Sequence, residues 1–297
     1  MPAIRVASPI CGFRPWVGTA KAVASRQART WARVASALAL LLLCAGSPAQ
    51  AGPVDTAALR LDGAGLLVTL RDGSTLAGEA LIGVELRLGS GDATYVIRID
   101  DVAPDPHAHD QSVMLYDVAV QDAASGRWDK LCEADPYGRP TAIPVPGFWD
   151  DDGTFVRGRP GEFSFACTAG AQGKCVRFGY LPWASAPNGD SLAPYHAACV
   201  RMVRADYCGD GVPRTVPGVT IQMFDRAGVH QPPDAGYGAF EALWGADGAV
   251  CLARARGPEF PLEEIPRACP RLAAVPPAAC TEGAIDTLPG ALLGNRS

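Results

Sequence analysis

The sequence lacks the short motifs by which many enzymes are recognised. It contains no G-x-S-x-G nucleophile elbow, no H-E-x-x-H zinc motif and no glycine pattern of a dinucleotide-binding loop. It also has no C-x-x-C pair, on which structural zinc sites are commonly built. These absences favour a protein that uses no metal and no cofactor.

Acidic residues are absent from the first 51 residues, whereas six basic residues lie within the first 33. The apolar run that follows, 34–45, has about a dozen residues, and a bilayer span needs about 20. Ala49-Gln50-Ala51 then has the small-x-small pattern of a signal-peptide cleavage site. We predict that residues 1–51 are a signal peptide, with a retained anchor as the weaker alternative. The chain is then periplasmic or secreted, with no membrane span after cleavage.

Charge is also scarce. Charged residues make up only 19% of the chain, and without the leader 31 acidic residues face 20 basic ones, a net charge of −11. This balance argues against binding to nucleic acid or to an anionic membrane surface, since both require clustered bases. The 33 glycines and 26 prolines favour short strands and turns over long helices. The ligand class that these observations leave open is a protein or a polysaccharide.

Eight cysteines follow the leader, and their even number in an exported chain predicts four disulfides. They are Cys132, Cys167, Cys175, Cys199, Cys208, Cys251, Cys269 and Cys280. Eight cysteines allow about a hundred pairings, and the sequence alone selects none. The glycine-rich stretch between Cys167 and Cys175 is compatible with a local bridge. On one helix Cys199 and Cys208 would lie about 13 Å apart, which excludes a bridge between them because bridged Cα atoms lie within about 7 Å.

Residues 52–160 have the pattern of a β-rich region. Residues 66–70 are a short apolar segment followed by the hairpin-type dipeptide Asp72-Gly73. Apolar and polar residues alternate with the period of half-buried strands over 84–88, 95–99 and 114–120. Their repeated spacing, with turns between them, predicts a small sandwich or barrel. Residues 133–161 contain many glycines and prolines, and we expect an irregular connection there.

The predicted fold class is α+β, in which this β-rich N-terminal part precedes a disulfide-stapled α+β domain at 161–272. A helix is predicted over 194–208, because proline opens the segment, glycine follows it and an apolar stripe runs along it. A second helix is predicted over 237–244 and a strand over 249–253. Residues 273–297 are small and rich in proline, and we expect a flexible tail.

Residues 205–211 read Ala-Asp-Tyr-Cys-Gly-Asp-Gly and are the centre of a family resemblance. Further blocks with shared cysteines lie before and after them: 173–176, 179–183, 196–202, 240–244, 247–251 and 268–272. Together these blocks resemble the ADYC domain family, which is named after the four letters at 205–208. The resemblance implies an exported or surface bacterial protein of unknown function. It supports structural cysteines and implies no catalytic role for any residue.

Four residues stand out as functional candidates: His196, Asp206, Tyr207 and Asp210. His196 lies three residues before Cys199, and a histidine beside a cysteine can activate a thiolate nucleophile. Asp206 and Asp210 flank Cys208, and two close carboxylates can divide the roles of acid and base. A residue set of this kind would suit a hydrolase or a transferase.

Each candidate also has a structural interpretation, which we favour. A cysteine in an even set is commonly bridged, an Asp next to a Gly often closes a turn, and Tyr207 suits a core position. The oxygen-rich turn at 208–211 lacks the spacing of an EF-hand calcium loop. The sequence therefore favours a non-enzymatic binding or envelope-associated module. The alternative is a cell-envelope enzyme that uses His196 with Asp206 and Asp210, or a cysteine.

Overall fold

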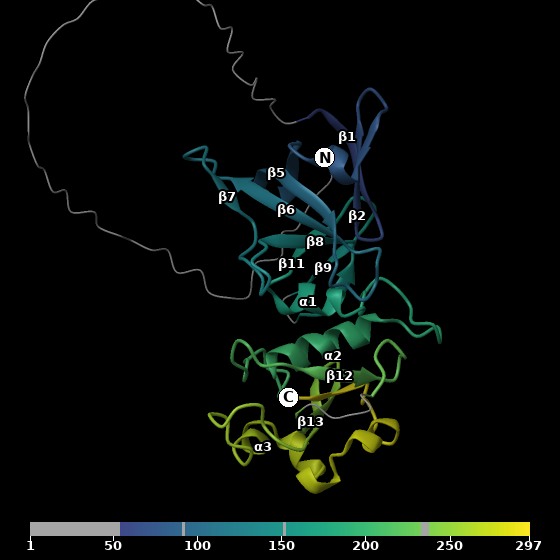
Figure 1. The fold of residues 1–297 in the computed structure, drawn as a ribbon, viewed down its shortest axis with the longest axis vertical. Coiled ribbons are helices and arrows are strands. Elements are labelled where there is room, and N and C mark those ends of the chain that lie inside the picture. Colours follow the sequence, from purple (N-terminus) through teal and green to yellow (C-terminus); the bar gives the residue numbers. More distant parts are fainter. Residues whose placement is uncertain (1–53, 91–92, 151–152, 233–237) are drawn as a thin grey trace, which may run out of the picture. The chain divides into compact units, whose positions relative to one another are not determined.

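The computed structural model describes residues 54–90, 93–150, 153–232 and 238–297 of the 297-residue chain (Figure 1). The predicted signal peptide at 1–51 lies outside the described residues. The described part is mixed α+β and rich in strands, with several antiparallel sheets and four disulfides. The predicted fold class is therefore confirmed.

Two antiparallel sheets form the N-terminal part. The smaller one contains β1 (Thr56–Asp62), β2 (Gly65–Leu70) and β3 (Thr75–Ala77), and η1 (Gly78–Leu81) follows it. The larger one has the strand order β11-β8-β6-β5-β4, and β7 also pairs with β6. Its strands are β4 (Glu85–Ser90), β5 (Ala93–Pro104), β6 (Met114–Gln121), β7 (Trp128–Lys130), β8 (Thr141–Val145) and β11 (Ser164–Cys167). The four predicted strand segments correspond to β2, β4, β5 and β6.

The two N-terminal sheets share one apolar core. Leu66 and Val68 of β2 belong to the same buried cluster as Ile99 of β5 and Val118 of β6. Within this core the backbone N–H of Leu66 donates to the hydroxyl of Tyr116 at 2.9 Å, which links the smaller sheet to β6. The alternation in the sequence therefore marks the side of each strand that faces this core.

Residues 133–161 are more regular than we expected. Besides β8 they contain β9 (Gly147–Trp149) and β10 (Phe155–Arg157). The expectation of an irregular connection is wrong for these strands. A proline does not end a strand where its missing N–H is not needed for a hydrogen bond between strands. β8 accommodates Pro144 because its pairing with β6 is confined to Thr141 and Ala142. The missing N–H of Pro144 therefore interrupts no bond of that ladder, and Pro144 lies opposite Phe165 of β11.

The C-terminal part is built on a four-stranded antiparallel sheet. The strand order is β12-β15-β13-β14, with β12 (Gln222–Asp225), β13 (Phe240–Gly245), β14 (Gly248–Leu252) and β15 (Leu293–Arg296). Two helices precede the sheet in the chain, α1 (Ala171–Arg177) and α2 (Ala193–Arg204), and α2 packs on β13 and β14 (Figure 1). Among the described helices, none has the length and apolar character that a bilayer crossing requires.

Two predictions for this part need correction. The helix predicted over 194–208 ends at Arg204, because Ala205 adopts a left-handed conformation with φ of 50°. The helix predicted over 237–244 is wrong, since β13 occupies 240–245. Residues 241–245 are all buried, and a strand buried on both faces shows no alternation of apolar and polar residues. The strand predicted over 249–253 is confirmed as β14.

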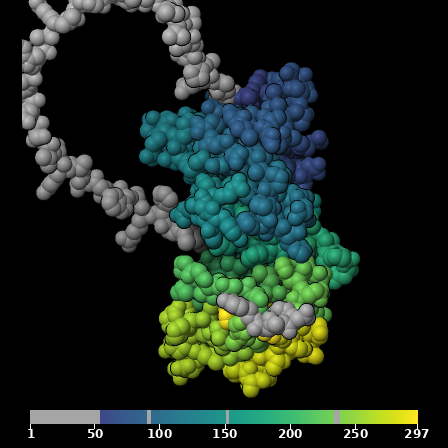
Figure 2. Space-filling view, in the orientation of Figure 1, coloured from purple at the N-terminus to yellow at the C-terminus, as the bar shows by residue number. Residues whose placement is uncertain are grey.

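The C-terminal segment 273–297 packs into the fold. After α3 (Ile265–Ala268) come η2 (Pro270–Ala274), η3 (Pro277–Ala279) and η4 (Glu282–Asp286), and then β15, which lies between β12 and β13. In the space-filling view its yellow residues lie against green residues that precede them in the chain (Figure 2). The expectation of a flexible tail is wrong, because β15 pairs with both β12 and β13. A Cβ on Gly294 would overlap the ring of Phe224, so Leu293 is the one large apolar residue that marks the strand in the sequence.

The four predicted disulfides are confirmed, and the structure defines their pairing. The bridges are Cys132–Cys167, Cys175–Cys199, Cys208–Cys269 and Cys251–Cys280, with Cα–Cα distances of 5.5, 5.8, 5.3 and 5.6 Å. Cys199 and Cys208 are not bonded to each other, as predicted, although α2 ends at Arg204 and does not contain Cys208. The suggested local bridge between Cys167 and Cys175 is wrong, because Cys175 lies in α1 and bonds Cys199 of α2.

Candidate functional site

The ADYC motif forms the turn by which the chain leaves α2. Ala205 is fully buried, has a positive φ and donates its N–H to the carbonyl of Met202 at 3.0 Å. Helices commonly end in this conformation, usually at a glycine, because a Cβ makes it less favourable. Here the methyl group of Ala205 belongs to the core beneath α2. Burial of the methyl group explains why an alanine occupies a position that glycine usually fills.

Asp206 closes this turn through its carboxylate. Its side chain is buried, and Oδ2 accepts hydrogen bonds from Arg201 at 2.6 Å and from the amide of Gly211 at 3.0 Å. Because Arg201 lies in the last turn of α2, this ion pair holds the turn against the helix. An Asp that accepts from a nearby backbone amide is a common turn device. These contacts give Asp206 a structural task.

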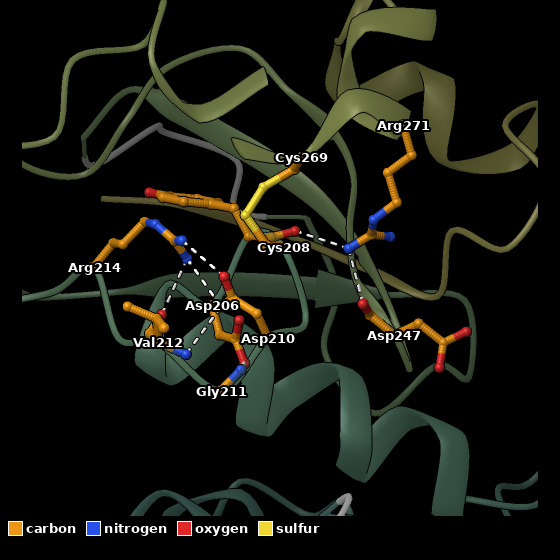
Figure 3. Close-up of a disulfide and its surroundings, with 10 residues drawn as sticks. Asp206, Cys208, Asp210, Gly211, Val212, Arg214, Asp247, Cys269 and Arg271 are labelled. Carbon is orange, nitrogen blue, oxygen red and sulfur yellow. Dashed lines mark hydrogen bonds and ion pairs between the residues drawn. A yellow bond between two sulfur atoms is a disulfide. The ribbon is translucent and has the colours of Figure 1, made fainter. Parts of the chain in front are cut away.

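Asp210 lies beside Asp206 in the same turn (Figure 3). Its carboxylate accepts from the amide of Val212 at 2.9 Å and from Nη2 of Arg214 at 3.0 Å. Burial alone raises the pKa of Asp210, but Arg214, the Val212 amide and the Asp206 side chain together hold it below its usual range. The two carboxylates therefore meet, as their spacing suggested, but arginines pair with both. Such a pair is poorly placed to exchange protons with a substrate.

Tyr207 reaches a polar network buried under α2. Its hydroxyl donates to Oε1 of Glu241 at 2.9 Å and accepts from the backbone N–H of Arg256 at 2.9 Å. Its ring stacks on Trp244 with ring centres 5.3 Å apart. Burial, and then the charge of Glu241, raise the pKa of the hydroxyl above its usual value. Tyr207 therefore stays protonated and keeps both hydrogen bonds.

Glu241 and Arg256 form the ion pair of this network. Their side chains are 0% and 1% exposed, and two hydrogen bonds of 2.9 and 3.0 Å join them. Arg256 also donates to the carbonyls of Met202 and Val203, in the last turn of α2, at 2.7 and 3.1 Å. The last carbonyls of a helix have no partner within the helix. Arg256 therefore caps α2, and Glu241 balances its charge.

Cys208 completes the motif through its bond to Cys269, in the segment that follows α3 (Figure 3). Next to this bridge Arg271 donates to the carbonyls of Tyr207 and Asp247 at 2.9 and 2.8 Å. The motif thus joins helix α2, the sheet and the segment after α3 at one place. Each of its four residues has a structural contact there.

His196 lies at the other end of α2, about 15 Å from the motif turn along the helix axis. It is buried, its Nε2–H donates to the carbonyl of Gln172 at 3.2 Å, and its ring centre lies 5.5 Å from that of Trp149. Burial lowers the pKa of His196 to about 4, against the opposing effect of the bond to Gln172. The neighbouring Cys199 is bridged, so it offers no thiol to activate. The structure therefore separates His196 from the other three candidates.

The described residues offer no ready metal site. No three His, Cys, Asp or Glu side chains among them are placed to hold a metal ion. The oxygen-rich turn at 208–211 contributes Asp210, which Arg214 already binds. A cation in that turn would have to displace an arginine.

A half-open groove lies at the N-terminal end of α2, and none of the four residues singled out in the sequence lines it. Its volume is about 370 Å³. The lining residues are Asn188, Asp190, Ser191, Pro194, Tyr195, Arg226 and Leu292. In the sequence, the polar turn before Pro194 is the only local sign of this groove. It is a weak sign, because many turns have the same composition without forming a site. Arg226 and Leu292 come from distant segments, which no local pattern connects to this turn.

The groove contains a hydroxyl without a partner. Tyr195 is 5% exposed, and among the described residues no group forms a hydrogen bond with its hydroxyl. Burial, and then the charge of Asp190, raise the pKa of Tyr195, whereas Arg226 lowers it. Both charges therefore act on the same hydroxyl, which faces a space large enough for a small ligand.

The fold and the motif first define a class, a strand-rich α+β domain with disulfides in which a helix ends in an Ala-Asp-Tyr-Cys turn. The model of the ADYC domain family matches residues 78–258, more than half of the chain, and the chain belongs to this family. The match begins well before residue 161, where we placed the start of the family-like region, and it includes the larger N-terminal sheet. No curated protein and no solved structure gives a significant match. The family has no defined function.

Proposed function

We propose that this chain is an exported binding module and that its ADYC turn has no catalytic role. The observation that carries the proposal is a contrast between the two ends of α2. At the motif end the candidate side chains are engaged by arginines, a buried glutamate, backbone amides and a disulfide. At the other end Tyr195 lines a groove, and its hydroxyl forms no hydrogen bond with the residues that the structure describes. Ligand sites combine an apolar lining with a few polar groups placed in this way.

The proposed location is the periplasm or the extracellular space, with a function in or near the cell envelope. Four disulfides are typical of an oxidising, extracytoplasmic compartment. The basic leader without acids and its short apolar run support export through a cleaved signal peptide.

The alternative, a cell-envelope hydrolase or transferase, requires His196 to meet Asp206 and Asp210 in one open pocket. These groups lie at opposite ends of α2, and His196 and Asp206 are both buried. The cysteines nearest to them, Cys199 and Cys208, are both bridged. This arrangement supports the binding function over the enzyme.

A thiol count on protein purified from the oxidising compartment without reductant tests the proposal. We expect iodoacetamide to modify none of the eight cysteines after the leader, whether the protein is native or unfolded in urea. Reduction should then expose all eight to the reagent, as read by intact mass. The same spectrum should give a chain that begins at Gly52. A native protein alkylated at Cys199 or Cys208 would support the enzyme and contradict the proposal.

A further inference from the structure

We propose that the groove at the first turn of α2 binds a small zwitterion of the dipeptide class. Its ammonium group would lie toward Asp190 and its carboxylate toward Arg226 and the hydroxyl of Tyr195. This inference rests on the binding function proposed above and names the class of ligand. Three features of the groove carry it: opposite charges, a fixed hydroxyl and a small apolar lining.

Two opposite charges reach the groove from different segments. Asp190 is exposed, and Asn188 bonds its Oδ2 at 2.9 Å, which leaves Oδ1 for a ligand. Arg226 is also exposed, and its two polar contacts are long, 3.9 Å from Nε to Asp286 and 3.5 Å from Nη1 to the carbonyl of Ala291. A ligand with one charge of each sign complements both walls. A neutral sugar or a simple anion would use only part of the groove.

The hydroxyl of Tyr195 supplies the third contact. The residue as a whole is buried, and Tyr195 lines the groove. A carboxylate held by Arg226 would accept a hydrogen bond from its hydroxyl. The ring of Tyr195 stacks on Tyr180, with ring centres 6.4 Å apart and an angle of 12°. The hydroxyl is therefore held in position before the ligand arrives, which favours binding.

The size and lining of the groove suit a dipeptide. Small-ligand pockets have volumes of about 300–1,000 Å³, and this groove, at about 370 Å³, is near the lower end of that range. Pro194 and Leu292 add apolar surface on which short side chains can pack. A folded protein or a long polysaccharide would find most of its contacts outside such a groove.

Isothermal titration calorimetry with L-alanyl-L-alanine tests the inference on the full exported chain with its disulfides intact. We expect the dipeptide to bind, and its N-acetyl and C-terminal amide derivatives each to bind about tenfold more weakly, because each loses one charge-assisted contact. The Asp190→Asn variant should bind the free dipeptide and its N-acetyl derivative equally well. The Arg226→Gln variant should bind the free dipeptide and its C-terminal amide equally well. Tyr195→Phe should weaken dipeptide binding about fivefold. The melting temperature of this variant should stay unchanged, since the hydroxyl has no partner among the described residues.

Arg127→Gln and Asp129→Asn are matched controls, because these residues form an exposed ion pair on the larger N-terminal sheet, at 3.0 Å. Neither should change dipeptide binding. Absence of dipeptide binding at millimolar concentration overturns the ligand class. If the dipeptide does not bind but maltose does, and Tyr195→Phe abolishes maltose binding, only the ligand class is wrong and the proposed binding function still holds. Dipeptide binding that none of the three groove variants affects overturns the site. Release of free alanine, followed by NMR, contradicts the non-enzymatic function and leaves the ligand class intact.

Discussion

The core shared by the two N-terminal sheets and the core beneath α2 differ in what they bury. The cluster shared by the two N-terminal sheets contains only apolar and aromatic residues, whereas the C-terminal part buries Glu241, Arg256 and Asn295. Outside that cluster the N-terminal part also buries Asp105 and Asp135, both paired with Arg177 of α1. Three of the four disulfides also lie in the C-terminal part. Apolar burial has no directional preference, but a buried ion pair is tolerated only when its geometry and hydrogen bonds are satisfied. Hydrophobic patterning thus specifies the core shared by the two N-terminal sheets, and specific polar and covalent contacts specify the core beneath α2.

The largest effect should come from Glu241→Gln. The substitution keeps the shape of the side chain but leaves the buried charge of Arg256 without its partner. Breaking a buried ion pair in this way costs about 3–5 kcal/mol. Urea unfolding of the protein with intact disulfides, followed by circular dichroism, measures the change in free energy of unfolding.

The control for this prediction is Asp129→Asn, which removes the exposed partner of Arg127. Exposed ion pairs contribute about 0–1 kcal/mol, so this variant should unfold almost as the wild type does. The proposed difference between the two parts fails if Glu241→Gln costs as little as this control does.

Ile99→Ala should have the next largest effect, about 3 kcal/mol, because it leaves a cavity in the core shared by the N-terminal sheets. Ile99→Val should recover most of that loss, since shortening this side chain by one methyl group costs only about 1 kcal/mol. Glu241→Asp should recover little, because the shorter side chain cannot reach Tyr207, Arg256 and Asn295 together. Parallel urea titrations of the four variants give this comparison. If Glu241→Asp regains as large a share of the lost stability as Ile99→Val does, packing and not the geometry of the buried ion pair determines the stability of both cores.

The same contrast explains how much of the fold the sequence could predict. β5 buries one face, so its apolar residues alternate and the strand is evident from the sequence. β13 is buried on both faces and resembles a helix when its composition is read alone. β15 needs Gly294 next to the ring of Phe224, and a glycine carries no sign of a strand. Patterns thus predict elements that touch solvent on one side and fail for those that other elements enclose.

The candidate site divides in the same way. The meeting of Asp206 and Asp210 was predictable, because only the three residues of a short turn separate them. The partners of Tyr207 were not, because Glu241 and Arg256 lie 34 and 49 residues further along the chain. Contacts at such separations depend on the sheet, whose assembly no local pattern encodes. The groove escaped prediction for the same reason, since three separate segments form it.

The smallest predicted effect uses the buried His196 to extend the contrast to pH. Its pKa of about 4 in the folded protein lies below the ordinary value of 6.5, because burial disfavours the charged ring. Between these values the unfolded chain binds more protons than the folded one does. The contribution of His196 is therefore complete above pH about 6.5 and declines as the pH falls toward 4. From pH 7 to pH 5 the free energy of unfolding should decrease by about 2 kcal/mol on this account.

Urea unfolding of the wild type and of His196→Gln at both pH values isolates this contribution. Glutamine can still donate to the carbonyl of Gln172, but it does not titrate, so the variant should lose that part of the pH dependence. Identical pH dependence in the two proteins would mean that protonation of His196 does not oppose folding. The ring would then have to reach water in a way that its burial beside Trp149 excludes. If His196→Gln instead loses the decrease in free energy of unfolding between pH 7 and pH 5, a buried polar group contributes to the stability of the C-terminal part in addition to apolar packing.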